Sequence, residues 1–267
     1  MSNFTDISKH YRHNAELQKS AGEQLFGMTV INRTDDVLDL GCGPGHLTAA
    51  IRKLTDGRVI GIDPSKGMIE KAEAAYPDQR ISFLIGDAEH LDMADAVDVI
   101  FCNSTLQWFR DMNRAIANCC RALRSGGRMA VQAPARHRYC PNFVQAAESL
   151  LQDDSTRTTF QHFRSPWIFF DTAEEYAEVF ERAGFRVLSS EIREVSMMCP
   201  PEKVMEMFDT GAAAAYLNPE CYDCAFPEDY IAKARRVIAQ DFSRQAGEDN
   251  LVNLLFSRIY LIAEKKP

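Results

Sequence analysis

The fold of this chain is decided by the stretch Val37-Leu38-Asp39-Leu40-Gly41-Cys42-Gly43-Pro44-Gly45. Its apolar start, Val37 to Leu40, is interrupted only by Asp39 and predicts a strand buried on both faces. Three alternating glycines follow, and the amphipathic run from His46 to Leu54 predicts a helix directly after them. Such a turn lets backbone approach a ligand, and the first N–H groups of the helix point at the same place. The stretch therefore predicts a cofactor site.

The spacing of these glycines separates two classes of cofactor. A dinucleotide fingerprint has its third glycine three positions after the second. Here Gly45 follows Gly43 by two positions, and His46 stands where the dinucleotide glycine belongs. Asp39 at the strand end would repel a pyrophosphate, whereas it suits a ligand that carries an ammonium group. For this stretch alone, an ordinary glycine-rich turn is the alternative.

Composition places the chain among ordinary globular proteins. Its 267 residues are 46% hydrophobic and 25% charged, which allows one large domain or one domain with an inserted cap. The net charge of −8 disfavours a nucleic-acid partner, because a phosphate backbone would be repelled. The polar residues 1–13 and the lack of a long apolar run lead us to expect a cytoplasmic protein without a membrane partner.

Cysteine usage gives little reason to expect a metal site. Without a secretory signal, we expect the eight cysteines to be reduced thiols. Cys221 and Cys224 have zinc or redox spacing, but no second pair and no histidine follows them. We therefore expect no metal.

Strand and helix patterns alternate along most of the chain. This alternation predicts an α/β fold with a seven-stranded, mostly parallel sheet and helices on both faces. The helix that begins near 111 is expected to end at Ser125-Gly126-Gly127. The predicted strands are 37–40, 58–63, 81–86, 97–102, 128–132, 185–195 and 251–264. Further helices are expected at about 15–28, 142–152, 173–183, 202–208 and 227–244, with Ser65 capping one after the second strand.

Acidic residues end the second and third strands. Asp63 can accept two hydrogen bonds from ribose hydroxyls. Asp87 can accept from an adenine amino group while the N–H of Ala88 faces a ring nitrogen, or it can cap a helix instead. Met68 either covers the adenine ring or packs in the core. Because Asp39, Asp63 and Asp87 each stand at the end of one of the first three strands, we favour cofactor binding as the role of Asp87.

The fourth strand runs into a polar segment at the expected binding crevice. In a doubly wound sheet, ligands bind at the carboxyl ends of the strands. Asn103 and the trio Leu106-Gln107-Trp108 are therefore expected near the reacting group.

Together these motifs resemble the class I S-adenosylmethionine-dependent methyltransferases. Within them the chain is most similar to the branch that contains the malonyl-acyl-carrier-protein and trans-aconitate methyltransferases. The resemblance covers residues 10–135 and 183–185, and from Met197 onward it matches neither activity. The motifs that carry it are residues 11 and 13–18, 38–45, 61–63, 86–89 and 103–108.

The resemblance implies a Rossmann-like fold with an antiparallel seventh strand, and S-adenosylmethionine as cofactor. Asp39 and Gly41 would hold its methionine end, Asp63 the ribose, and Asp87 and Ala88 the adenine, with Asn103 near the sulfonium. The expected cofactor-binding residues are Tyr11, Asp39, Gly41, Cys42, Gly43, Gly45, Asp63, Pro64, Met68, Asp87, Ala88, Glu89, Asn103 and Ser104.

The predicted domain organisation places insertions around this cofactor-binding core. Residues 1–35 form an N-terminal helical segment over the cofactor site, and 36–135 form the cofactor-binding core. Residues 136–171 form a cap insertion, 172–196 return to the core, 197–248 form a second cap insertion, and 249–267 form the final core strand.

Methyl transfer to a carboxylate needs alignment and a cationic clamp, because the carboxylate is already ionised at neutral pH. Residues 128–166 contain five arginines and three acids, a local net charge of +2 within a chain of net charge −8. A small-molecule or carrier-bound carboxylate held by Trp108 and by Arg136, Arg138 or Arg164 is therefore one hypothesis, and a solvated basic face is its alternative.

Two other functions stay open. Methylation of an amine, hydroxyl or carbon needs a base, for which His137 or Tyr139 is available. The second open function is that of a non-catalytic protein that binds S-adenosylmethionine. The candidate catalytic residues are Asn103, Gln107, Trp108, His137 and Tyr139.

Overall fold

The computed structural model describes residues 16–77 and 80–267 of the chain. The prediction for Tyr11 lies outside the described residues. The chain divides into two compact units. The sheet unit comprises Glu16–His137, Trp167–Arg193 and Arg258–Pro267, and the helical unit contains Arg138–Pro166 and Glu194–Ser257.

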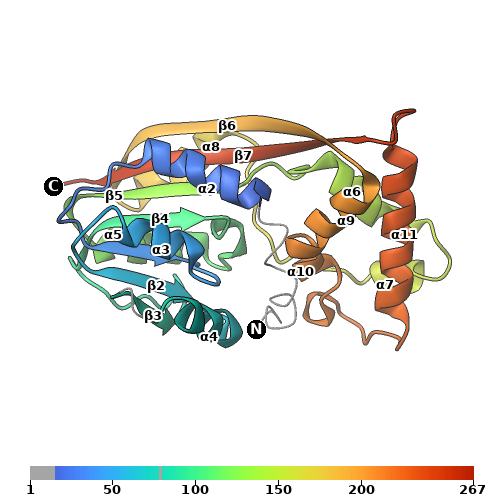
Figure 1. The fold of residues 1–267 in the computed structure, drawn as a ribbon, viewed down its shortest axis with the longest axis horizontal. Helices are drawn as coiled ribbons and strands as arrows, with labels where there is room; N and C mark the ends of the chain where they lie inside the picture. The colour runs from blue at the N-terminus through green and yellow to red at the C-terminus, as the bar shows by residue number, and fades with distance from the viewer. Residues whose placement is uncertain (1–15, 78–79) are drawn as a thin grey trace. The chain divides into compact units, whose positions relative to one another are not determined.

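A seven-stranded sheet, counted over the described residues, has the order β3-β2-β1-β4-β5-β7-β6, and Figure 1 shows the strands in this sequence. β1 pairs in parallel with β2 and β4, β2 with β3, and β4 with β5, whereas β7 is antiparallel to β5. The predicted mostly parallel sheet with an antiparallel seventh strand is confirmed. The strands are β1 (Val37–Leu40), β2 (Val59–Asp63), β3 (Ser82–Ile85), β4 (Val97–Asn103), β5 (Leu123–Pro134), β6 (Phe185–Cys199) and β7 (Val252–Lys265).

Helices cover both faces of the sheet because its strands alternate apolar residues on each side. Leu38, Ile100 and Leu261 pack with α5 and α8 on one face. Val37, Phe101 and Tyr260 pack with α2 and α3 on the other, which we call the α3 face. The helices of the sheet unit are α2 (Glu16–Met28), α3 (His46–Arg52), α4 (Lys66–Ala75), α5 (Met112–Ala122) and α8 (Ala173–Arg182), with a 3₁₀ turn, η1 (Leu106–Trp108).

Side-chain caps fix where these helices begin. Ser65 Oγ accepts from Met68 N, so the predicted N-cap of α4 is present. Asp111 caps α5 in the same way. Thr172 and Glu175 form a reciprocal capping box at the start of α8. Each cap accepts a hydrogen bond from a backbone N–H that has no partner within its helix.

The predicted end of α5 is wrong. The helix ends at Ala122, and Leu123 already begins β5, so Gly126 and Gly127 lie within the strand. There the register with β4 shifts, since Val97 pairs with Leu123 and Val99 pairs with Arg128. Gly126 has φ of 73°, and a Cβ atom at Gly127 would lie 2.8 Å from a backbone oxygen. The two glycines therefore serve an irregularity of the strand and not a helix end.

The helical unit has an aromatic core of its own. Phe143 packs edge-to-face against Phe208 and Phe256, and Phe208 stacks on Tyr216. The elements of the helical unit are α6 (Pro141–Glu148), η2 (Ser149–Leu151), α7 (Arg157–Phe160), α9 (Pro201–Thr210), α10 (Ala213–Tyr216), η3 (Pro219–Cys221) and α11 (Tyr230–Gln245), with the distal parts of β6 and β7.

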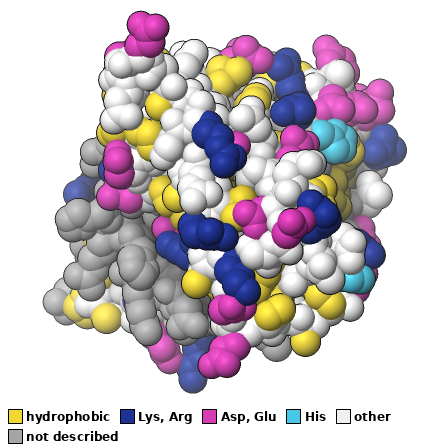
Figure 2. Space-filling view, turned by 90° about the vertical axis from the view of Figure 1, so that its right-hand side faces the viewer, with side chains coloured by type: hydrophobic (Ala, Val, Ile, Leu, Met, Phe, Trp, Pro, Cys, Tyr) yellow, Lys and Arg dark blue, Asp and Glu magenta, His cyan; other side chains and the backbone are white. Residues whose placement is uncertain are grey.

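On the face of the molecule drawn in Figure 2, basic and acidic side chains are interspersed.

Substituting Gly61 in β2 tests the close packing behind the glycine turn. A Cβ atom there would lie 2.8 Å from Phe83 Cδ1 and 3.0 Å from Cys42 Sγ. Gly61→Ala should lower the free energy of unfolding by about 1–3 kcal/mol, because overpacking displaces neighbours. Gly27→Ala is the matched control, since its Cβ would meet nothing within 4 Å and should stabilise α2 by up to about 1 kcal/mol. Urea denaturation measures both, and equal stabilities would contradict this account.

Candidate functional site

The three glycines between β1 and α3 all have positive φ, 76° at Gly41, 52° at Gly43 and 85° at Gly45. A Cβ atom at Gly41 would collide with Thr105 Oγ1, and one at Gly45 would lie 2.8 Å from Phe83 Cζ. At Gly43 a Cβ atom would meet nothing within 4 Å. The turn is therefore closely packed at two glycines and open at the middle one, which leaves room for a ligand beside the backbone.

Asp63, at the tip of β2, holds this turn in place. Its Oδ2 accepts from Gly43 N at 2.9 Å, and its Oδ1 accepts from Ser65 N at 2.9 Å. Burial raises the pKa of Asp63, and the two backbone hydrogen bonds oppose that rise. Each carboxylate oxygen has a second lone pair, so the same group can also accept from the two hydroxyls of a ribose.

Asp39 is the buried carboxylate of β1, with 2% of its surface exposed. Thr48 Oγ1 of α3 donates to its Oδ2 at 2.6 Å. Burial raises the pKa of Asp39 to about 7; the Thr48 hydrogen bond opposes this rise and the charge of Asp63 adds to it. A cationic group bound beside Asp39 would lower this pKa again. The pair of acids therefore suits a ligand with a positive charge and no phosphate.

Asp87 and its neighbours occupy the turn after β3. Asp87 Oδ1 accepts from His90 N at 2.9 Å and so holds a turn; no helix begins there, and the alternative of a helix cap is wrong. Ala88 is buried. Glu89 Oε1 accepts from Arg110 N at 2.7 Å, and this bond ties the turn after β3 to the segment after β4.

Two of the expected cofactor residues also have clear packing roles. Cys42 lies in a small hydrophobic cluster with Phe83 and α4, and burial raises the pKa of its thiol. Met68 is buried in the first turn of α4, which fits the core-packing alternative. Pro64, between them in sequence, is exposed.

The segment after β4 is held by its own polar and aromatic contacts. Ser104 has φ of 56°, and its carbonyl accepts from Gln107 Nε2 at 2.9 Å. The Gln107 carbonyl accepts from Ile168 N at 3.0 Å. Trp108 packs edge-to-face on Trp167, with ring centroids 5.5 Å apart. Gln107 is buried and acts as a support for this segment.

A row of polar side chains crosses the α3 face next to this segment. Asn103 pairs in register with Gln132, which pairs with Tyr260. The Gln132 amide is oriented so that its nitrogen donates to Asn103 Oδ1 at 2.9 Å and to Ser104 Oγ at 3.1 Å. Its oxygen then accepts from Arg258 Nη1 at 2.9 Å. We call Asn103, Gln132, Tyr260 and Arg258 the polar row.

Sequence reasoning missed Arg258. It is 4% exposed, although it lies within the last predicted strand, 251–264. The signal was present, because Phe256, Arg258, Tyr260 and Ile262 follow the strand period of two. A charged residue at an inward position of an apolar strand is rare and indicates a buried polar contact.

The two candidate bases have different surroundings. His137 Nδ1 lies 3.0 Å from Asp171 Oδ2, and the histidine side chain is 75% exposed. Tyr139, in the helical unit, is buried, and burial raises the pKa of its hydroxyl well above the ordinary value. A tyrosine that keeps its proton at neutral pH is a poor general base, so the structure argues against that role for Tyr139.

The three candidate substrate arginines belong to different units. Arg136, in the sheet unit, has φ of 69°, and its backbone N–H donates to Phe170 O at 2.9 Å. Arg138 and Arg164 are exposed residues of the helical unit. Arg164 Nε lies 2.7 Å from Asp223 Oδ2, so its charge is already paired at the surface.

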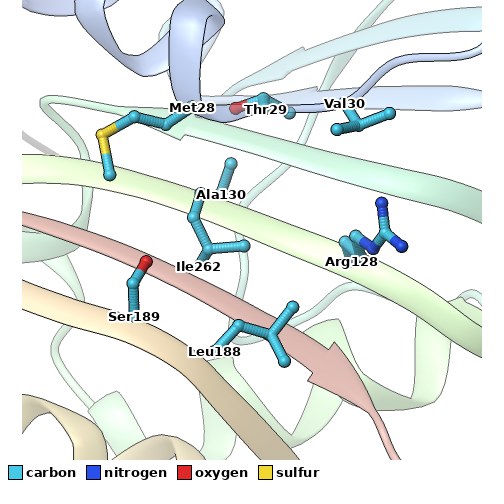
Figure 3. Close-up of a pocket in the computed structure, with 8 residues that line it drawn as sticks. All are labelled: Met28, Thr29, Val30, Arg128, Ala130, Leu188, Ser189 and Ile262. Atoms are coloured by element: carbon cyan, nitrogen blue, oxygen red, sulfur yellow. The ribbon is translucent and has the colours of Figure 1, made fainter.

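A hollow of about 240 Å³ lies elsewhere on the α3 face, between the end of α2 and strands β5, β6 and β7 (Figure 3). It is lined by Met28, Thr29, Val30, Arg128, Ala130, Leu188, Ser189 and Ile262, and none of these is a predicted site residue. The lining residues of β5 precede Gln132, so the hollow is away from the carboxyl ends of the parallel strands. It is not the candidate site.

The described cysteines, acids and helices bear on metal binding and on membrane crossing. All eight cysteines lie within the described residues and are free thiols. Across residues 16–77 and 80–267, no group of three or more His, Cys, Asp or Glu side chains is placed to hold a metal ion. Within the same ranges, no helix has the length and apolar character that a membrane crossing requires.

Comparisons with known proteins agree with this geometry. A family model described as "Methyltransferase domain" matches residues 38–131. Trans-aconitate 2-methyltransferase of Escherichia coli O157:H7 is 34% identical over 258 residues, 96% of each chain. Malonyl-[acyl-carrier protein] O-methyltransferase of Priestia megaterium is 32% identical over 128 residues, which are 46% of this chain and about half, 47%, of that enzyme.

A similar fold occurs in the YcgJ protein of Bacillus subtilis. The TM-score is 0.63 at 16% identity, over 93% of this chain and 99% of that one. An open glycine turn, a buried acid with a half-buried one beside it, and a full-length relative at 34% identity lead to one conclusion. The chain belongs to the S-adenosylmethionine-dependent methyltransferases.

Proposed function

We propose that the protein transfers a methyl group from S-adenosylmethionine to a carboxylate oxygen of a small molecule, either free or carried on an acyl carrier protein. The relatives named above act on trans-aconitate and on a malonyl group, and both of these carry carboxylates. The cofactor, when bound, supplies a methyl group made electrophilic by the sulfonium. The chain has to hold the acceptor in line and to keep water out.

The single observation that carries the carboxylate class is the chemistry beside Asn103. Its register neighbours across the sheet are Gln132 and Tyr260. An amide cannot take up a proton at neutral pH, and burial raises the pKa of Tyr260, against the charges of Arg258 and Arg193. A carboxylate acceptor is already ionised and needs no base, whereas an amine or hydroxyl acceptor does.

The cofactor assignment follows the acids of β1, β2 and the turn after β3. We propose that Asp39 receives the ammonium group of the methionine moiety, with the open backbone of Gly43 beside it. Asp63 accepts from the ribose hydroxyls, and Asp87 and Ala88 contact the adenine. The remaining proposed cofactor contacts are Gly41, Cys42, Gly45, Pro64, Met68, Glu89, Asn103 and Ser104.

A second candidate function is methylation of an amine, hydroxyl or carbon. The observation in its favour is the His137–Asp171 contact, because a carboxylate that holds one ring nitrogen orients the imidazole so that the other nitrogen faces outward. Such a pair is also common on solvated surfaces.

The product's stability in alkali separates the two functions. We expect label from methyl-labelled S-adenosylmethionine to enter a metabolite extract and then to leave as volatile methanol under mild alkali, because only methyl esters hydrolyse in this way. Label that survives alkali would contradict the carboxylate proposal and favour His137 as a base. Binding of S-adenosylhomocysteine without any labelled product would favour a non-catalytic protein.

Cofactor affinity should depend on pH through Asp39. Its pKa of about 7 in the free protein means that the carboxyl is mostly protonated at pH 6 and mostly ionised at pH 8. Affinity for S-adenosylhomocysteine should therefore fall by about tenfold as the pH is lowered across this range. Calorimetric titrations at several pH values measure it.

Asp39→Asn is the control for this titration. The variant should bind S-adenosylhomocysteine more weakly at pH 8 and lose the pH dependence of affinity, except for the part that comes from the ligand's own ionisation. If the affinity of Asp39→Asn for S-adenosylhomocysteine depends on pH as the wild-type affinity does, Asp39 does not contact the cofactor.

The raised pKa of Asp39 also affects folding stability. Its contribution is largest below the unfolded pKa of about 4 and is lost as the pH rises through about 7.

The three candidate arginines can be tested by kinetics. Arg136→Ala, Arg138→Ala and Arg164→Ala should each be assayed, and the true clamp should show a KM for substrate raised by about tenfold or more with cofactor affinity intact. Asp223→Ala is the matched variant for Arg164, since it frees that guanidinium and should lower KM if Arg164 binds substrate. Unchanged kinetics in all four would make these arginines solvated surface charges.

A further inference from the structure

Asn118 is an unusual residue for the buried face of α5. It is 9% exposed, whereas the other buried residues of this helix are apolar. Its Nδ2 donates to Ala88 O at 3.0 Å and to Glu89 O at 2.9 Å. Both hydrogens of the amide can therefore be used by the turn after β3. A buried amide that bonds two successive carbonyls indicates that this turn must keep one position.

The carboxylate of the same turn, residues 87–90, is held as well. Asp87 Oδ1 accepts from His90 N at 2.9 Å, and His90 Nδ1 lies 2.8 Å from Oδ1 and 3.0 Å from Oδ2. Ala88, between them, belongs to the same hydrophobic cluster as the apolar residues of α5. We call residues 87–90 the 87–90 turn. Its carboxylate, its carbonyls and its apolar side chain each have a fixed contact.

The 87–90 turn presents one donor and one acceptor. Ala88 is 1% exposed, and its N–H has no hydrogen-bond partner among the residues that the structure describes. Buried backbone N–H groups nearly always have a partner, so this one calls for an acceptor. The Asp87 side chain is 39% exposed, and its oxygens can accept further hydrogen bonds. A ligand edge with an amino group beside an unprotonated ring nitrogen complements this pair.

We propose that Asn118 sets the base specificity of the cofactor site by fixing the 87–90 turn. This proposal rests on the proposed function, in which Asp87 and Ala88 contact the adenine of the cofactor. Adenine carries an amino group next to an unprotonated ring nitrogen, whereas hypoxanthine carries a carbonyl oxygen next to a ring N–H. Hypoxanthine would therefore set an acceptor against the carboxylate and a donor against the Ala88 N–H. Both protein groups would lose a hydrogen bond, and a polar site rejects a ligand of the same shape in this way.

Such rejection needs a turn that cannot adapt. If the peptide groups around Ala88 could rotate, a carbonyl could take the place of the N–H and accept from hypoxanthine. The Ala88 and Glu89 carbonyls, however, cannot turn away without leaving the buried Asn118 amide unpaired, and an unpaired buried group is costly. Asn118 does not touch the ligand in this arrangement, so it is a positioning residue.

Base specificity can be measured as a ratio of two affinities. The protein is titrated calorimetrically with S-adenosylhomocysteine and with S-inosylhomocysteine, which differ only in the base. In wild type the Kd of the inosyl ligand should be higher by about 100-fold or more, because two hydrogen bonds are lost. Asn118→Leu is similar in size and removes both donors. This ratio should then fall to about tenfold or less, because the turn can adapt to hypoxanthine.

A purely structural role of Asn118 would give a different result. Loss of structure alone would weaken both ligands by the same factor and leave the ratio of their Kd values at the wild-type level, which would overturn the inference. Asn118→Ser provides a second test should Asn118→Leu fail to fold, because a serine hydroxyl can bond to a carbonyl within its own helix. The ratio should fall in Asn118→Ser too, and a wild-type ratio there would equally count against the inference.

Arg121→Met is the matched control, on the same side of α5 and about one turn further along. Arg121 Nη2 donates to Leu91 O at 2.8 Å and its Nε to Met93 O at 3.4 Å, both beyond the 87–90 turn. This variant should lower the melting temperature and keep the wild-type ratio. A ratio that falls equally in Arg121→Met and Asn118→Leu would assign base specificity to the whole segment and overturn the role of Asn118.

Asp87→Asn separates this inference from the proposed function. An asparagine amide can turn and donate to the hypoxanthine oxygen, so the ratio should fall in this variant. If it falls in Asp87→Asn but not in the Asn118 variants, only the inference fails. If wild type binds both ligands equally, the proposed adenine contacts of Asp87 and Ala88 fail together with the inference. The alkali test on wild type reports separately on the carboxylate acceptor.

Discussion

The hydrogen bond from Gly43 N to Asp63 Oδ2 is the contact on which the candidate site depends. It joins the turn after β1 to the tip of the neighbouring strand, so the backbone that must stay open for a ligand is fixed by an acid from another strand. Asp63 is also bonded to Ser65 N, which begins α4. One carboxylate thus orients two βα turns. Its burial makes both hydrogen bonds matter more, because an unsatisfied charge there would be costly.

Much of the sheet unit could be predicted from local sequence. The run from Val37 to Gly45 contains a buried strand, a turn with positive φ that favours glycine, and a helix start, and each feature has its own physical reason. Ser65 was recognisable as a cap because capping is a local property. The end of α5 was not, since Gly126 and Gly127 also suit a helix end. Pairing with β4, a contact distant in sequence, assigns them to β5 instead.

The polar row shows a different limit of sequence reasoning. Asn103 was found because it follows a strand that ends at the expected crevice. Arg258 comes more than a hundred residues later, and its contact with Gln132 exists only because β7 is antiparallel to β5. The local net charge of residues 128–166 led to the prediction that one of their arginines binds substrate. Arg164, however, is paired with Asp223 at the surface. Local charge density detects exposed groups, whereas a single buried charge is detectable only through strand period and register.

The sheet ends in β6, a strand of fifteen residues with no further strand beyond it in the described order. A long open edge offers unpaired backbone groups to any other extended chain. Arg186, Glu191 and Arg193 break up this edge with charges of both signs. Another chain would have to desolvate them to pair there, which is unfavourable. The enzyme can therefore keep β6 as a long edge strand that does not pair with other extended chains and so does not promote aggregation.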